Sequence, residues 1–400
     1  MTPKKILLMA HDVTLAHLGR PLCLAEGLIA DGHDVTLAAS AESARFLEAF
    51  PGHVHTLAPT GKARFIDNLA KGRPVFDFDT LKRFAEEDDA LLAALRPDLV
   101  IGDFRLSLSV SARRAGVPYA TISNAYWHPA LAPHFVVPDL PMVRYLGVPL
   151  SQALFNLARP IAFAYHARPL NALRRHYGMP SLGNDLRRIY TDADLVLFSD
   201  IPETYGLSED SIPDAVFLGP LCWSPDIPLP EWWSQLDPTL PTLYVTLGSS
   251  GDPELLPKLV AHVRKLGAQA MVSTAGTPLP ATDGRIFCAA YLPGDQAAAR
   301  ADLVVCNGGS PTTFQALSAG VPVLGIPGNL DQFLNMYYLE RSGVGRTLRS
   351  PRLASEAASA TIGGMLESGS FRSAAQHMRR IIAPYDPARR LSNGIARLLA

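Results

Sequence analysis

The stretch from residue 302 to residue 345 constrains the fold of this chain most, because it reads twice as a strand, a turn and a helix. Residues 303–306 (LVVC) are short, apolar and β-prone, as is typical of a strand buried on both faces of a sheet. A glycine turn follows at 307–309, and Ser310 with Pro311 then suits the start of a helix that Ser310 caps. This alternation predicts an α/β fold built on a parallel sheet.

The two helix starts in this stretch are suited to bind a phosphate group. The first N–H groups of a helix have no partner within it, so a helix that begins beyond a parallel strand presents them to a ligand. Ser310 and Thr312 add hydroxyl groups at the first helix. A glycine turn of this kind also occurs without a ligand. The polar cluster of Asp331, Gln332 and Asn335 after the second strand favours a binding site, because a helix cap alone does not explain it.

Three submotifs in this stretch resemble the donor-binding motif of the family 1 glycosyltransferases, the UDP-glycosyltransferase superfamily. The family patterns H-G-G-x-G-T-T, A-L-x-x-G-V-P and D-Q-x-x-N appear here as NGGSPTT, ALSAGVP and DQFLN, in that order. Asn307 stands where the family has a phosphate-binding histidine, and Pro311 replaces a glycine. Asparagine can donate a hydrogen bond to a phosphate but brings no positive charge, so the helix start would carry more of the leaving group's stabilisation.

The resemblance implies an α/β chain of the GT-B fold, with two Rossmann-like domains facing a cleft that holds donor and acceptor. The expected N-terminal acceptor-binding domain spans 1–218, a proline-dense linker spans 219–238, and the donor-binding domain spans 239–400. A basic amphipathic helix over about 372–399 would be able to cross back to the N-terminal domain. Four hundred residues suffice for two domains of ordinary size.

His17 and Asp103 are the candidate catalytic pair. His17 lies just before the first expected helix, which should begin at about Leu18, and the nearby helix N-terminus disfavours imidazolium and so suits a general base. The position resembles the family's G-H-x-x-P element, with Ala16 and Arg20 in place of glycine and proline. The resemblance implies that His17 deprotonates the acceptor hydroxyl and that Asp103 orients it. The alternatives are structural caps at both positions, or His11 of the same loop as the base.

The donor site implied by the resemblance extends beyond the phosphate turn. Residues 291–293 resemble the segment that contacts uracil or thymine, and the turn at 248–251 should face the diphosphate or the reacting centre. The expected donor-binding residues are Gly248, Ser249, Ser250, Tyr291, Leu292, Asn307, Gly308, Gly309, Ser310, Thr312, Thr313, Asp331, Gln332 and Asn335.

The acceptor side is less well marked. The loop-rich stretch 126–136 carries aromatic and imidazole side chains that could line a pocket or simply pack the loops. Its candidate acceptor-binding residues are Trp127, His128, His134 and Phe135. The helical stretch 151–177 has apolar faces with arginines among them, which suits either a lipid-like acceptor at a membrane surface or packing against the domain. His33, in a turn, is expected to be structural.

Composition and cysteine spacing argue against several other classes of protein, namely nucleic-acid-binding, transmembrane, disulfide-rich and metal-binding proteins. A net charge of −1 gives no support for a nucleic-acid partner, and no apolar run is long enough for a transmembrane helix. Four cysteines without CxxC spacing indicate neither a metal site nor a disulfide framework, which favours the cytoplasm, with peripheral contact at the inner membrane face left open. The triplet at 77–79 (DFD) is a weak metal motif, and Asp79 is expected to cap a helix from Leu81.

The expected function is inverting, metal-independent transfer of a hexose to a hydroxyl of a small hydrophobic or lipid-like acceptor. The donor is a nucleoside diphosphate sugar, with UDP ahead of TDP, and no cofactor is expected because the donor is a substrate. One alternative is an epimerase or hydrolase on the same fold, which would consume donor without acceptor. Another is a non-catalytic GT-B partner protein, which Asn307 and Pro311 favour and His17, Asp103 and the DQFLN element oppose.

Overall fold

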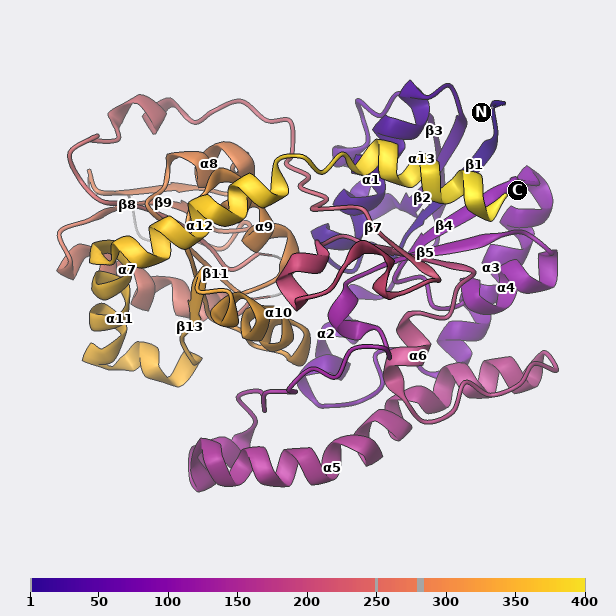
Figure 1. Cartoon of the computed structure of the whole chain (residues 1–400), viewed down its shortest axis with the longest axis horizontal. Helices are drawn as coiled ribbons and strands as arrows, with labels where there is room; N and C mark the ends of the chain where they lie inside the picture. The colour runs from indigo at the N-terminus through magenta and orange to yellow at the C-terminus, as the bar shows by residue number, and fades with distance from the viewer. Residues whose placement is uncertain (1, 249–250, 279–283, 400) are drawn as a thin grey trace. The chain divides into compact units, whose positions relative to one another are not determined.

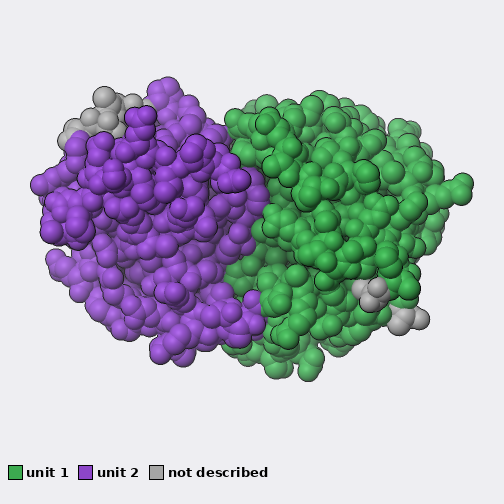
Figure 2. Space-filling view, turned by 90° about the horizontal axis from the view of Figure 1, so that it is seen from above, with its two compact units in different colours: residues 1–132, 153–221, 386–400 green, residues 133–152, 222–385 purple. Residues whose placement is uncertain are grey.

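The computed structural model describes residues 2–248, 251–278 and 284–399. The chain divides into two compact units, which Figure 2 shows in different colours. The first unit comprises Met1–Ala132, Ala153–Leu221 and Asp386–Ala400, and the second comprises Pro133–Gln152 and Cys222–Tyr385. Each unit has its own parallel sheet flanked by helices, which confirms the predicted fold class.

The described part of the first unit holds a seven-stranded parallel sheet with strand order β3-β2-β1-β4-β5-β6-β7. The central strands are buried throughout, as expected of strands covered on both faces. The order reverses between β1 and β4, and in such sheets ligands bind beyond the carboxyl ends of the strands at this point. The strands are β1 (Lys5–Ala10), β2 (Asp34–Ser40), β3 (His53–Leu57), β4 (Leu99–Asp103), β5 (Tyr119–Ser123), β6 (Leu195–Phe198) and β7 (Ala215–Phe217).

The helices of the first unit are α1 (Leu15–Ala30), α2 (Lys62–Ala70), α3 (Phe78–Leu95), α4 (Leu108–Ala115), α6 (Leu186–Tyr190) and α13 (Pro387–Leu398), together with most of α5 (Pro141–His176) (Figure 1). The prediction that Asp79 caps α3 is wrong, because Asp77 is the N-cap and its carboxylate accepts from the Thr80 N–H at 2.9 Å. Among the described residues, no helix is both long and apolar enough to cross a bilayer.

The second unit holds a six-stranded parallel sheet among its described residues, in the order β10-β9-β8-β11-β12-β13. The predicted double strand–turn–helix of 302–345 is present as β11, α9, β12 and α10. The strands are β8 (Thr242–Thr246), β9 (Gln269–Ser273), β10 (Ile286–Ala289), β11 (Leu303–Cys306), β12 (Val323–Gly325) and β13 (Gly345–Thr347). The helices are α7 (Leu256–Lys265), α8 (Gly294–Arg300), α9 (Ser310–Ala319), α10 (Leu330–Arg341), α11 (Glu356–Glu367) and α12 (Gly369–Ile382).

Residues 133–152 belong to the second unit, although the sequence placed them in the N-terminal domain. Asp139 is the anchor: its carboxylate pairs with the Arg349 guanidinium and accepts from the N–H and hydroxyl of Ser350, both at 3.1 Å. Arg349 also donates to the carbonyl oxygen of Val137 at 2.8 Å. These contacts join segments about 210 residues apart, so no local pattern could predict them.

The C-terminal region forms two helices where the sequence predicted one. Helix α12 ends at Ile382, because Pro384 has no N–H with which to continue it. Asp386 then caps α13 by accepting from the Arg389 N–H at 3.1 Å. Helix α13 belongs to the first unit and packs on α1, so closely that a Cβ at Gly27 would lie 2.6 Å from the Cβ of Ala388. The predicted crossing of the last helix to the N-terminal domain is therefore confirmed.

Candidate active site

His17 and Asp103 lie together at the carboxyl ends of β1 and β4 in the first unit. His17 sits in the first turn of α1 and Asp103 ends β4, two elements that neighbour each other at the point where the strand order reverses. The Nδ1 atom of His17 is 2.7 Å from Oδ1 of Asp103. The Asp103 side chain is fully buried, whereas part of the His17 ring reaches solvent. A buried carboxylate behind an accessible imidazole is the arrangement that a general base requires.

Arg20 completes this cluster, and the sequence had noted it only as a departure from the family motif. It lies three residues after His17, on the same side of α1. Its Nε donates to Oδ2 of Asp103 at 2.8 Å and its Nη2 donates to Oδ1 at 2.6 Å, a bidentate pair. Its Nη1 is within hydrogen-bonding distance of Asn124 and Ser199, at 3.2 and 3.3 Å. The guanidinium therefore compensates the charge of the buried carboxylate and fixes its orientation.

Arg20 and Asp103 also compete for the same nitrogen of His17. Arg20 Nη2 lies 2.9 Å from His17 Nδ1, close to the distance from that atom to Asp103. If Nδ1 carries the proton, it donates to Asp103 and leaves Nε2 free to accept a proton from a substrate. If Nδ1 accepts from Arg20 instead, Nε2 carries the proton and the ring cannot act as a base. The balance between the two partners thus decides the tautomer.

An aromatic wall adjoins His17. The ring of Phe104 stacks on the imidazole with centroids 4.9 Å apart and planes 18° apart. Phe104 has a φ of 57°, a left-handed conformation that costs a non-glycine residue about 1 kcal/mol. Tyr190 packs 5.4 Å from Phe104, and Trp127 packs 5.0 Å from Tyr190. Phe76, 6.1 Å from Phe104, and Tyr190 also line a small apolar pocket with Leu81, Leu106, Leu170 and Ile189.

The four predicted acceptor residues divide between the two units. Trp127 belongs to the aromatic wall next to His17. His128 is held in its loop, where its Nδ1 accepts from the Ala130 N–H at 3.2 Å, and burial lowers the pKa of its imidazole. His134 and Phe135 belong to the second unit, where Phe135 is buried and the His134 ring lies 5.7 Å from that of Tyr337. Within the first unit, Trp127 is thus the predicted acceptor residue that joins the aromatic wall next to His17.

His11, the competing base, is poorly placed for catalysis. Its ring is fully buried between Phe76 and Phe84, with centroids 4.8 and 5.0 Å away. Burial lowers the pKa of His11 well below its usual value. Neither ring nitrogen has a hydrogen-bond partner among the described residues. His33 is structural as predicted, since its Nδ1 accepts from the Lys4 N–H at 3.1 Å.

A buried ion pair supports the loop that follows Asp103. Arg105 is fully buried, and its guanidinium contacts Asp88 of α3 at 2.8–2.9 Å. Asp88 is equally buried and also accepts from the hydroxyls of Ser107 and Ser111, at 2.5 and 3.1 Å. Burial raises the pKa of Asp88, whereas Arg105 and the hydroxyls act in the opposite direction. The pair ties α3 to the segment that places Asp103 and Phe104.

The phosphate turn of the second unit is built on Gly308. Its φ is 77°, and a Cβ there would lie 2.6 Å from Cγ of Met336, so glycine is required by both conformation and space. The Gly309 N–H donates to Oδ1 of Asn307 at 3.1 Å. The amide nitrogen of Asn307 faces the turn after β8, because a Cβ at Gly248 would lie 3.3 Å from it. Asn307 therefore combines a structural bond with a donor group at the mouth of the sheet.

Helix α9 begins in the way that an anion site needs. Its N-cap is Gly309, which has no side chain with which to cap it, so the prediction that Ser310 caps the helix is wrong by one position. Ser310 and Pro311 are the first helical residues, and Thr312 is half-buried in the first turn. Thr313 is fully buried and donates to the Ser310 carbonyl at 3.0 Å. The helix start therefore has no side-chain cap in the way of an anion.

The second predicted cluster contains two buried side chains that hold the turn and one half-buried carboxylate. Asn335 is buried and donates to the Gly308 carbonyl at 2.8 Å and to the Thr313 hydroxyl at 2.9 Å, so it ties α10 to the phosphate turn. Gln332 is buried and accepts from the Gly328 N–H at 2.8 Å. Asp331 is half-buried and is not the helix cap, which is Asn329.

The remaining donor candidates follow neighbouring strands of the same sheet. Gly248 comes after β8 with a φ of 63°, while Ser249 and Ser250 lie outside the described residues. Tyr291 is half-buried and Leu292 buried, between β10 and α8. The strand order reverses at β8, next to β11, so these positions lie at the carboxyl edge where α/β sheets bind ligands.

Arg20, Phe104 and Tyr190 are the site residues that sequence reasoning missed. Arg20 had a detectable signal, since residues three apart on a helix face the same side and His17 was already a candidate. Phe104 had a weaker one, because it follows Asp103 directly. Tyr190 had none, because it reaches the site from α6, far along the chain.

Comparison with known proteins identifies the family of this chain. The C-terminal domain family of erythromycin biosynthesis protein CIII-like proteins matches residues 262–388. The chain is 42% identical over 385 residues to a PGL/p-HBAD biosynthesis glycosyltransferase of Mycobacterium tuberculosis, covering 95% of the chain and 89% of the relative. It is 42% identical over 379 residues to a PGL/p-HBAD biosynthesis rhamnosyltransferase of Mycobacterium bovis, covering 94% and 83% respectively.

The fold comparison extends over the whole chain. The crystal structure of the glycosyltransferase of kitacinnamycin superposes with a TM-score of 0.71 and covers 100% of both chains, at 20% identity. At that identity the likeness concerns the GT-B fold, whereas the mycobacterial relatives share sequence over both units. The chain therefore belongs to the family 1 glycosyltransferases and is a glycosyltransferase of the GT-B fold.

Proposed function

We propose that this glycosyltransferase moves a hexose, with inversion and without a metal ion, from a nucleoside diphosphate sugar to the hydroxyl of a small hydrophobic or lipid-like acceptor. The His17–Asp103–Arg20 cluster, with a buried carboxylate behind a partly exposed imidazole and an aromatic wall beside it, is the observation that carries the proposal. The names of the mycobacterial relatives, which refer to PGL/p-HBAD biosynthesis and in one case to rhamnosyl transfer, support sugar transfer to a lipid-like acceptor.

The first unit supplies the base. With its Nδ1 proton donated to Asp103, His17 has a lone pair on Nε2 that accepts the proton of the acceptor hydroxyl. As the acceptor oxygen loses its proton, it attacks the anomeric carbon of the sugar, and the bond between that carbon and the diphosphate breaks. The imidazolium that forms is stabilised by the buried Asp103 carboxylate, whose position Arg20 fixes. The aromatic wall would hold the apolar body of the acceptor.

The second unit holds the donor. The open start of α9 and the amide of Asn307 meet the charge that develops on the departing diphosphate. Asp331 and Gln332 of the DQFLN element are proposed to hold sugar hydroxyls, while Asn335 supports the turn. Since backbone and amide donors supply this stabilisation in the proposed mechanism, transfer should continue in the presence of EDTA. We place the enzyme in the cytoplasm, with UDP as the expected nucleotide.

Nucleotide binding tests the donor half of this proposal. UDP is expected to raise the melting temperature of the protein more than TDP or GDP, because a ligand that binds only the folded state stabilises it by about 2.7 kcal/mol at a hundred times its Kd. Asn307→Ala should reduce the UDP shift. Asp331→Ala should keep the UDP shift but lose the additional shift that a UDP-hexose gives. Differential scanning fluorimetry measures all three.

The control for this experiment is Glu367→Ala, an exposed change on α11 that should leave every shift unchanged. A larger shift with TDP would reassign the nucleotide and leave the transfer reaction in place. The absence of a shift with any nucleotide would instead overturn the donor site. Consumption of the bound nucleotide sugar without an acceptor would favour the hydrolase or epimerase alternative.

A further inference from the structure

Helix α5 carries an apolar stripe that faces solvent in the first unit. Leu154, Leu157, Ile161 and Tyr165 are spaced three and four residues apart, so they share one side of the helix. Leu157 and Ile161 are 78% and 74% exposed, and Leu154 and Tyr165 are each 42% exposed. Single exposed apolar side chains are ordinary, but a continuous row of them on one helix face marks an interaction surface.

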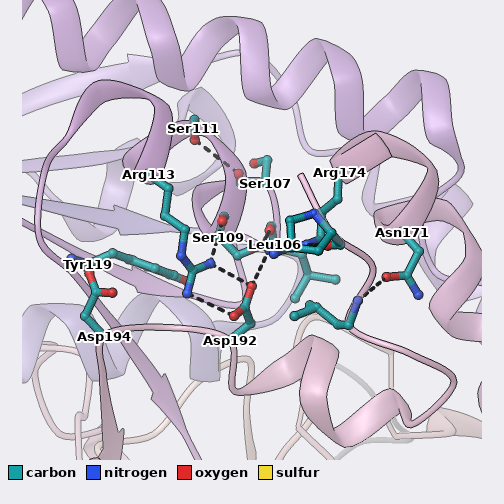
Figure 3. A network of polar contacts seen from close by, with 12 residues as sticks. Leu106, Ser107, Ser109, Ser111, Arg113, Tyr119, Asn171, Arg174, Asp192 and Asp194 are labelled. Atoms are coloured by element: carbon teal, nitrogen blue, oxygen red, sulfur yellow. Dashed lines mark hydrogen bonds and ion pairs between the residues drawn. The ribbon is translucent and has the colours of Figure 1, made fainter. Parts of the chain in front are cut away.

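The opposite side of α5 is fixed to the unit. Phe163, Ala167, Leu170 and Leu173 are buried along it. Near the end of the helix, Arg174 donates to Asp192 at 2.7 Å, and the same carboxylate pairs with Arg113 of α4 at 2.7 and 2.9 Å (Figure 3). Helix α5 cannot rotate to bury its exposed stripe without breaking this network.

Further apolar side chains precede the stripe along the chain. Gly147 has non-helical φ and ψ angles of 72° and 168°, so α5 consists of two helices that meet at a kink. The residues of α5 that belong to the second unit expose Tyr145 at 80%, together with Leu146, Val148 and Leu150. No charged residue occurs between Arg144 and Arg159. The segment is therefore apolar over more than the four residues of the stripe.

The charges of this segment all have one sign. No aspartate or glutamate occurs between Asp139 and Asp185, whereas five arginines do, in a chain whose net charge is only −1. Arg168 and Arg175 are exposed and continue the side of the stripe, because they follow Tyr165 by three and ten residues. An apolar row that ends in exposed arginines complements an anionic lipid surface, in which acyl chains lie beneath negative head groups.

We propose that α5 binds the surface of an anionic lipid bilayer, with Leu154, Leu157, Ile161 and Tyr165 entering the interface and Arg168 and Arg175 contacting the head groups. Helix α5 lies in the plane of the interface in this arrangement, since no helix among the described residues is able to span a bilayer. A second copy of the chain fits less well, because a pair of such helices offers no acidic residue to face the arginines. The proposal does not depend on the transfer reaction.

Vesicle flotation tests the proposal with the full chain. The protein should float with vesicles that contain phosphatidylglycerol and should not float with pure phosphatidylcholine vesicles. Leu157→Glu/Ile161→Glu should reduce the bound fraction at least about tenfold, because it puts two carboxylates where the apolar side chains enter the interface. Arg168→Gln/Arg175→Gln should weaken binding at low salt and reduce its dependence on salt.

The matched control is Val54→Glu/Leu229→Glu, which makes the same change of charge at two exposed apolar residues outside α5 and should float as the wild type does. Circular dichroism and the melting temperature of each variant establish that it is folded. The proposal would be overturned if the α5 double variant and the control double variant floated equally well, or if the wild type did not bind anionic vesicles. A wild-type dimer that Leu157→Glu/Ile161→Glu converts to a monomer, without any vesicle binding, would assign the stripe to a second copy instead.

Discussion

Replacing His17 by alanine is expected to lower kcat of sugar transfer by about a thousandfold, because the acceptor hydroxyl loses the base that removes its proton. Asp103→Asn should have an effect of similar size, since an amide no longer favours the tautomer that leaves Nε2 free. Neither change should alter the thermal shift given by the nucleotide, because the predicted donor residues belong to the second unit. Steady-state kinetics with a fixed acceptor measure the loss.

The control for this prediction is His55→Ala, which removes an exposed imidazole from β3 of the same unit and should leave kcat unchanged. A loss of less than about tenfold in His17→Ala would mean that another group takes the proton, since general-base catalysis is generally worth more than this. His11 would not be the replacement, because its ring is buried between two phenylalanines.

The largest loss of stability is expected from Asp88→Ala. The free energy of unfolding should fall by about 3 kcal/mol, because the change removes the fully buried carboxylate that pairs with Arg105 and leaves the guanidinium only the partly exposed Glu87, 2.7 Å away. The hydroxyls of Ser107 and Ser111 lose their acceptor at the same time. Urea unfolding followed by circular dichroism measures the change.

The neighbouring residue offers a matched control. Asp89 pairs with Arg114 in a contact that solvent reaches, so Asp89→Ala should cost about 1 kcal/mol or less. The double change Asp88→Ala/Arg105→Met should recover part of the loss of Asp88→Ala, because it also removes the buried guanidinium that has lost its buried carboxylate partner. Equal losses for Asp88→Ala and Asp89→Ala would contradict the role given to the buried pair.

The second unit was predictable from sequence where several local signals agree. In the stretch from β11 to α10, apolar runs, glycine turns and a proline at a helix start all indicate the same elements, and the structure has them. The C-terminal region shows the limit of such reasoning. Its amphipathic pattern continues across Pro384, so it suggested one helix, whereas the missing N–H of proline divides it in two.

The catalytic cluster was predictable only in part. His17 and Asp103 are 86 residues apart, but each follows a strand, and the carboxyl ends of neighbouring parallel strands meet at one edge of a sheet. Arg20 reaches Asp103 from the second turn of α1, and this contact depends on the angle at which α1 packs against the sheet. Residues 133–152, which include the predicted acceptor residues His134 and Phe135, join the second unit through Asp139 and Arg349, a tertiary contact that no local pattern could predict.

The configuration of the product at the anomeric carbon is the measurement that tests the proposed mechanism most directly. Nuclear magnetic resonance of the purified product gives this configuration from the coupling constant or chemical shift of the anomeric proton. If a base activates the acceptor for direct displacement, the product of the wild type should have the anomeric configuration opposite to that of the donor. His17→Ala should form this product far more slowly. A product that retains the donor's configuration would contradict the mechanism, because a single displacement assisted by His17 cannot produce it.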